Sequence, residues 1–303
     1  MAALFDAYIM VDWSAAAKPS LGANSIWIGI LAKDARLKLQ YRGVNIDTRL
    51  KARAFIEDMV AKLTKRGDKV LIGFDFSLGF PAGTAAALGL DTSAQAPWQA
   101  TYAHLASKLK DKPDNSNARY AIAAGLNYAI SKSAFPFWGA PARDVVSTLS
   151  ATRPDYDGGS LPEYRICENY LKEKKIGQPK SVWQLAYTGS VGSQTLTGIP
   201  HVHALRQAWP TSRIWPFELG TEALSAEALE GIDVVMAEIY PSLVKAKPEK
   251  GEVADEAQVR EIARHYADLD EKGRLAAAFS TAKSLSPEQN RHITEEEGWI
   301  LGV

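Results

Sequence analysis

Two carboxylates stand where strand-forming residues give way to loops. Asp12 ends the segment AYIMVD (7–12), and Asp75 interrupts the apolar stretch IGFDFSLGFP (72–81). A charge at the end of a buried strand is costly unless it is paired, hydrogen-bonded or bound to a metal. Each aspartate is therefore either the cap of the turn that follows it or a group with a chemical role.

Further acids come late in the chain. Glu238 sits within an apolar strand-like segment, VVMAEIY (234–240), and Asp255, Asp268 and Asp270 lie in a helical region. Clustered carboxylates repel one another and persist mainly where a divalent cation neutralises them. Bound Mg²⁺ or Mn²⁺ would activate a water for phosphodiester hydrolysis. We take Asp12, Asp75, Glu238 and Asp270 as the predicted metal-binding and catalytic set.

The sequence leaves open which aspartate of the helical region belongs to this set. Asp255 is also a fitting N-cap, in a capping box with Gln258, and Asp268 and Asp270 would suit a solvated surface. Asp255, Asp268 and Asp270 therefore compete for the role, with Asp270 preferred.

A glycine-rich segment is the predicted phosphate contact. In GSVGSQT (189–195), Ser190, Ser193 and Gln194 would line a backbone nest for an anion, although a tight glycine turn explains the pattern as well. Lys18 would contact a phosphate or remain in solvent. The segment lacks the lysine of a P-loop and the G-x-S-x-G of a serine hydrolase. His201 and His203 have no Cys/His partners for a zinc site.

The elements that must position these residues follow from periodicity. Segments 7–12, 25–32 and 37–44 read as strands. Segment 48–66 reads as an amphipathic helix between Asp47 as N-cap and Gly67 as C-cap, and 69–76 as a buried central strand. This β-β-β-α-β order is that of an RNase H-like fold, in which strands one and four are neighbours. We expect an α/β protein with a mixed five-stranded sheet, where Asp12 faces Asp75.

The rest of the chain divides in two. Residues 85–180 are rich in Pro, Gly and aromatic residues and predict an irregular, partly helical insertion. Residues 1–84 and 181–303 would form the core. Strands are expected at 213–218 and 232–243, and helices from Asp255 onward and at 274–285.

Bulk composition excludes several classes of protein. The 303 residues are 46% hydrophobic and carry 35 Lys+Arg against 35 Asp+Glu, which disfavours a protein that binds nucleic acid by positive charge alone. The single cysteine, Cys167, suits a reducing compartment. We expect a cytoplasmic protein without a signal peptide or membrane span; its oligomeric state stays open.

Several motifs in order resemble a known family. VDWSAA, IGFDFSLGFP, GSVGSQTLTGIP, IWPFE, AEIYPSL and EEGWILG together look like the domain of unknown function 429 family, described as nucleases of RNase H-like fold. The resemblance implies site roles for Asp12, Asp75 and Glu238. It also implies a helical aspartate pair, which DLDEKGRLAAAF keeps only in part.

Three functions fit these observations. The first is a metal-dependent nuclease or other phosphodiesterase that acts on nucleic acid. The second is an ATP-dependent phosphotransferase of the sugar-kinase and actin-like group, although VDWSAAAK lacks the glycine expected after Asp12. The third is a non-catalytic module that binds nucleic acid or protein.

Overall fold

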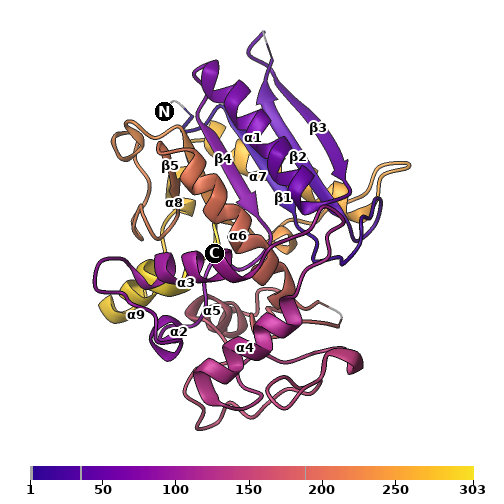
Figure 1. The fold of residues 1–303 in the computed structure, drawn as a ribbon. Coiled ribbons are helices and arrows are strands. Elements are labelled where there is room, and N and C mark those ends of the chain that lie inside the picture. Colours follow the sequence, from indigo (N-terminus) through magenta and orange to yellow (C-terminus); the bar gives the residue numbers. More distant parts are fainter. Residues whose placement is uncertain (1–2, 35, 188) are drawn as a thin grey trace.

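A mixed six-stranded sheet forms the centre of the protein (Figure 1). The computed structural model describes residues 3–34, 36–187 and 189–303. The strands lie in the order β3-β2-β1-β4-β6-β5. Their bounds are β1 Ala7–Asp12, β2 Ile26–Lys33, β3 Leu39–Ile46, β4 Val70–Phe74, β5 Ser212–Ile214 and β6 Val234–Glu238. The predicted α/β class is confirmed.

The strand directions change at β1. Strands β1, β2 and β3 form an antiparallel meander, whereas β4 pairs parallel with β1 and β6 pairs parallel with β4. The short strand β5, which overlaps the predicted strand 213–218, pairs parallel with β6 at the edge, so the sheet has six strands where a five-stranded sheet was expected. The chain therefore runs β-β-β-α-β as expected, and strands one and four are neighbours.

Helices cover both faces of the sheet (Figure 1). The α-helices are α1 Arg49–Lys65, α2 Thr84–Ala87, α3 Pro97–Lys108, α4 Arg119–Ser131, α5 Ile166–Lys174, α6 Gly192–Ala208, α7 Ala254–Glu271, α8 Leu275–Ala278 and α9 Pro287–His292. Short 3₁₀ turns span Ala142–Asp144, Glu227–Leu229 and Pro241–Leu243, and a π-helical turn spans Ile293–Glu297. None of the helices in the described part of the chain is long and apolar enough to cross a membrane.

Some element ends differ from prediction for local reasons. β3 begins two residues late because Asp34 closes the preceding turn, donating from its N–H to Lys38 O at 2.8 Å and accepting from Lys38 N at 3.0 Å. Thr48, not Asp47, caps α1. The predicted strand 232–243 ends at Glu238, before a 3₁₀ turn that begins at Pro241. The predicted helix 274–285 is only the four-residue α8.

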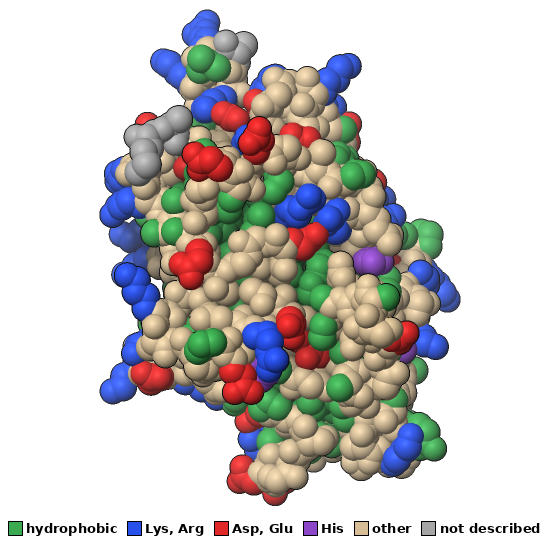
Figure 2. Space-filling model, turned by 90° about the vertical axis from the view of Figure 1, so that its left-hand side faces the viewer, with side chains coloured by type: hydrophobic (Ala, Val, Ile, Leu, Met, Phe, Trp, Pro, Cys, Tyr) green, Lys and Arg blue, Asp and Glu red, His purple; other side chains and the backbone are tan. Residues whose placement is uncertain are grey.

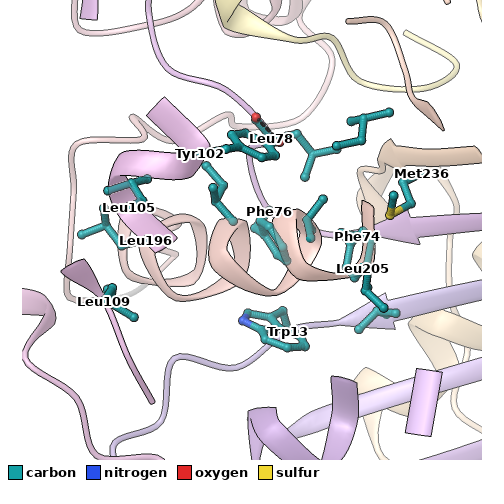
Figure 3. Close-up of a cluster of buried hydrophobic side chains, with 14 of the residues drawn as sticks. Trp13, Phe74, Phe76, Leu78, Tyr102, Leu105, Leu109, Leu196, Leu205 and Met236 are labelled. Carbon is teal, nitrogen blue, oxygen red and sulfur yellow. Dashed lines mark hydrogen bonds between the residues drawn. The ribbon is translucent and has the colours of Figure 1, made fainter. Parts of the chain in front are cut away.

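Side-chain alternation along the strands builds two cores. Val11, Trp13 and Phe74 point to the face covered by α1, α3 and α6, whereas Tyr8 and Met10 point to the face covered by α7. Figure 3 shows the first core, with Trp13 and Phe76 beside α6. The residues that follow Asp12 and Asp75 are thus buried anchors, which fix the positions of both aspartates.

Most of the predicted insertion packs into this first core, whereas Cys167 and Leu171 on α5 belong to the second. Segment 85–180 contains α3, α4 and α5, joined by irregular backbone. Trp98, Tyr102 and Leu105 on α3 belong to the same buried cluster as Phe76. The Tyr102 hydroxyl donates to Leu78 O at 2.7 Å, and Figure 3 shows the two residues beside each other. The loop after Asp75 is therefore held from within the insertion.

Gly198 allows α6 to approach this core closely. A Cβ atom at Gly198 would lie 2.2 Å from the Phe76 ring. We expect Gly198→Ala to lower the free energy of unfolding by about 1–2 kcal/mol, because overpacking outweighs the gain in helix propensity. Gly125 on α4 has nothing within 4 Å of the same position, so Gly125→Ala should be neutral or stabilising by up to about 1 kcal/mol. Urea denaturation tests both, and equal effects would contradict the packing argument.

Candidate functional site

The carboxylates of Asp12 and Asp75 meet at the carboxyl ends of β1 and β4. Alternation directs both toward the α7 face, and the two carboxyl groups are in hydrogen-bonding contact. The Trp13 N–H donates to Asp75 Oδ1 at 2.8 Å, and the Asp75 N–H donates to Val11 O at 3.2 Å. We call Asp12 and Asp75 the aspartate pair. The aspartate pair lies where the strand order reverses beside β1. In open α/β sheets, ligands bind at such a point.

Asp255 is the helical acid that approaches the pair. It lies in the first turn of α7, and its Oδ2 accepts a hydrogen bond from Asn24 N at 2.6 Å. It is not the N-cap, which is Val253. The negative charge of Asp255 acts on both Asp12 and Asp75.

Burial raises the pKa of both members of the aspartate pair. Burial, followed by the charges of Asp75 and Asp255, raises the pKa of Asp12 well above its usual range. Burial raises the pKa of Asp75 to about 7, although hydrogen bonds from the Trp13 N–H and the Asp12 carboxyl favour its charged form. A shared proton is the expected state of two carboxylates in contact without a cation.

Two pockets flank the pair. The Asp75 pocket has a volume of about 300 Å³, and its walls include Ser77, Lys180, Ile239 and Tyr240. The Asp12 pocket has a volume of about 510 Å³ and is lined by groups that include Arg119, Tyr120, Asn24, Asp255 and Gln258. Gly189, Ser190 and Gln194 line both pockets, so the two meet beside the aspartates.

The predicted phosphate-contact residues lie at this junction. Ser190 precedes α6, and Ser193 and Gln194 are in its first turn. Gln194 Nε2 donates to Trp13 O at 2.6 Å, and Ser193 Oγ accepts from Arg119 Nε at 3.2 Å. Because Ser190 and Gln194 at the start of α6 line both pockets, the positive end of the α6 dipole lies at the site. Lys18 does not line either pocket; it is exposed, and its backbone O accepts from Asn115 Nδ2 at 3.4 Å.

Glu238 is close to the pair but is already occupied. It pairs in register with Phe74, so it projects from the opposite face of the sheet to Asp75. The buried Arg165 guanidinium donates to both its carboxylate oxygens, at 2.6 and 2.8 Å, and Leu78 N donates at 2.9 Å. Arg165 also binds Glu168 and the backbone O of Glu297. Glu238 therefore supports the loop after Asp75 instead of holding an ion.

Asp270 does not join the site. It lies at the last turn of α7 and accepts hydrogen bonds from Leu4 N at 2.8 Å, Phe5 N at 2.9 Å and the Tyr8 hydroxyl at 2.7 Å. These groups are at the opposite end of β1 from Asp12, about 15 Å away for a strand of this length. Asp268 is exposed and paired with Lys272.

A buried ion pair that the sequence did not indicate fixes the wall of the Asp12 pocket. Arg49 binds Asp111 through two nitrogens, at 2.7 and 2.6 Å, and donates to Ser14 O and Ala16 O. His201 Nε2 lies 2.9 Å from Asp111, and its ring packs on Trp13. Nothing in the local pattern around Arg49, Asp111, Arg119 or Lys180 distinguishes these residues from ordinary surface charges. Only the tertiary arrangement assigns them to the site.

The donor set is thus a carboxylate pair with one further acid nearby. Among the residues that the structure describes, no group of three or more His, Cys, Asp or Glu side chains converges to hold a metal ion. In comparisons with family models, with curated proteins and with solved structures, no match to this chain was found.

Proposed function

We propose that this protein is a metal-dependent phosphodiesterase whose reaction takes place at the aspartate pair. The observation that carries the proposal is the contact between the Asp12 and Asp75 carboxyls at the ends of adjacent parallel strands. The strand order, an antiparallel meander followed by a parallel neighbour of β1, supports an RNase H-like core. The resemblance of the sequence motifs to predicted nucleases supports the same reaction class.

The residues present fit Mg²⁺ or Mn²⁺. Mg²⁺ retains several waters and is held in many enzymes by one or two carboxylates together with substrate phosphate, so a third protein ligand is not required. The pKa of each carboxyl is raised, and a cation bound between them would balance their two charges. Asp12 and Asp75 would hold the ion. When bound, the ion supplies a water of lowered pKa and neutralises charge on the phosphoryl oxygens.

The surrounding residues would bind and orient the substrate. Arg119 and Lys180 are cations on the walls of the two pockets and would contact the phosphate oxygens. The α6 N-terminus favours the same negative charge. Asp255 would accept a hydrogen bond from the attacking water. Water adds to phosphorus, the bond from phosphorus to the leaving oxygen breaks, and the water's proton ends on the leaving group or in solvent.

Hydrolysis of bis(p-nitrophenyl) phosphate tests the proposal. We expect release of p-nitrophenolate with Mn²⁺ or Mg²⁺, none with excess chelator, and loss of release in Asp12→Asn. Asp268→Asn is the matched control, because Asp268 is an exposed acid outside the site. Hydrolysis that persists in purified Asp12→Asn would overturn the assignment.

Two other functions correspond to other outcomes. A phosphotransferase would be stabilised against heat by Mg-ATP and would transfer its terminal phosphoryl group. A non-catalytic module would show neither hydrolysis nor nucleotide stabilisation, with Mn²⁺ leaving its melting temperature unchanged.

A further inference from the structure

The pockets on the two sides of the aspartate pair differ in chemistry. Leu171, Val191, Ile239 and Ile300 give the Asp75 pocket apolar walls, and Tyr240 adds an aromatic ring. Its volume of about 300 Å³ is at the small end for ligand pockets, and it suits a single ring-sized group. The carboxylates of Glu168 and Glu238 that border it are held by Arg165, so they do not repel an incoming substrate as free charges would.

The Asp12 pocket carries an aromatic and guanidinium pair with amide groups. The Arg119 guanidinium carbon lies 4.7 Å from the centre of the Tyr120 ring, and both side chains are half-buried. Aromatic rings and guanidinium planes are the surfaces on which nucleobases stack. Asn24, Gln194 and Gln258 supply donors and acceptors for base edges or sugar hydroxyls.

The small number of positive charges in the two pockets favours a short substrate over a long nucleic acid strand. Proteins that track long nucleic acid strands do so with continuous basic surfaces. Here the chain has no net charge, and Arg119 and Lys180 are the cations among the described residues that line the two pockets. Figure 2 shows Lys and Arg side chains interspersed with Asp and Glu on one face of the molecule.

Resting on the proposed function, we infer that the substrate is a short phosphodiester with a nucleoside on at least one side, such as a dinucleotide or the end of a single strand. The nucleoside lies in the Asp12 pocket beside Tyr120. The phosphate lies at the aspartate pair, and the group on its other side enters the Asp75 pocket. A duplex would not place its bases in either pocket while paired.

Two esters with the same leaving group test this inference. One is the p-nitrophenyl ester of thymidine 5′-monophosphate, and the other is methyl p-nitrophenyl phosphate, which has no base. We expect Tyr120→Leu, which keeps apolar packing, to lower kcat/KM for the thymidine ester about 10-fold or more and to change that for the methyl ester less than about 2-fold. Tyr120→Phe keeps the aromatic ring, so it should restore kcat/KM for the thymidine ester. Tyr128→Leu, at an exposed tyrosine of the same helix, should change neither rate.

The possible results separate the two proposals. If both esters are cleaved in an Asp12-dependent way but Tyr120→Leu affects them equally or not at all, the nucleoside subsite is overturned and the phosphodiesterase remains. Faster cleavage of a 20-base-pair duplex than of thymidylyl-thymidine, per phosphodiester, would also overturn it. If the wild-type protein with Mn²⁺ cleaves neither ester, the proposed function fails and the subsite fails with it.

Discussion

Replacing Asp75 with asparagine is expected to lower metal-dependent hydrolysis by about 10²–10³-fold and to stabilise the metal-free protein above pH 7. The first effect follows because asparagine lacks the charge that would hold a divalent cation beside Asp12. The second follows because the variant has one fewer acid in a half-buried pair of like charges. Hydrolysis of bis(p-nitrophenyl) phosphate and thermal melts at several pH values measure the two effects.

The direction of the pH effect comes from the raised pKa of Asp75. Its pKa is about 7 in the fold and 3.8 in the ordinary case, so the folded state binds the proton more tightly than the unfolded chain. The contribution of this group to stability is therefore most favourable below pH 4 and falls as pH rises through 7. The wild-type melting temperature should fall as pH rises from 4 through 7. It should rise again when Mg²⁺ takes the place of the proton. Asp75→Asn should show a flatter profile.

A matched acid outside the site provides the control. Asp268→Asn should keep the wild-type pH profile over pH 4–7, because its acid is exposed and paired with Lys272. If Asp75→Asn melts at a lower temperature than the wild type at pH 8 without metal, the carboxyl contact stabilises the fold, and the like-charge argument is wrong.

Replacing Arg165 with methionine is expected to lower the free energy of unfolding by about 3–5 kcal/mol. The guanidinium is fully buried and donates to Glu168, Glu238 and the backbone of Glu297. Its removal leaves two carboxylates in the interior without a counter-charge. A loss of this size is a large part of the stability of an ordinary domain, so the variant should melt at a clearly lower temperature than the wild type.

Acid should partly rescue this variant. Burial raises the pKa of Glu238 even with Arg165 present, and without the guanidinium that pKa should rise further. The deficit relative to wild type should therefore shrink from pH 8 to pH 5. Arg153→Met is the control, because the Arg153 and Glu163 pair is at the surface and such pairs contribute about 0–1 kcal/mol. Urea denaturation that gives equal losses for Arg165→Met and Arg153→Met would refute the role of this network.

The adjacency of β1 and β4, and with it the aspartate pair, was predictable from local patterns together with the strand order of a known fold that has the same sequence of elements. The alternation and length of apolar runs identified β1 and β4, and the β-β-β-α-β sequence of elements implied that they are neighbours. Once the strands are adjacent, equal positions at their carboxyl ends bring Asp12 and Asp75 together. No long-range information beyond the order of elements is needed for that step.

The third acid was not predictable in the same way. Asp255 and Asp270 lie on one helix, and sequence alone does not indicate which end of α7 reaches the carboxyl end of β1. The answer depends on the direction in which α7 crosses the sheet, which packing of Val259, Ile262 and Tyr266 decides. Glu238 was misassigned for a related reason. Its face of the sheet depends on the register with Phe74, and its partner Arg165 comes from an irregular segment without periodicity.

The contacts of Arg165 also set an order of events during synthesis. Asp12 and Asp75 emerge from the ribosome early, and strands β2 and β3 of the same sheet lie between them in the chain. The loop after Asp75 is held by Glu238, which is held by Arg165, and Arg165 in turn donates to Glu297 O. Leu301 N donates to Glu238 O at 2.9 Å. A nascent chain therefore carries its aspartate pair long before the residues that enclose the Asp75 pocket exist, and the pocket closes only when synthesis has passed residue 301.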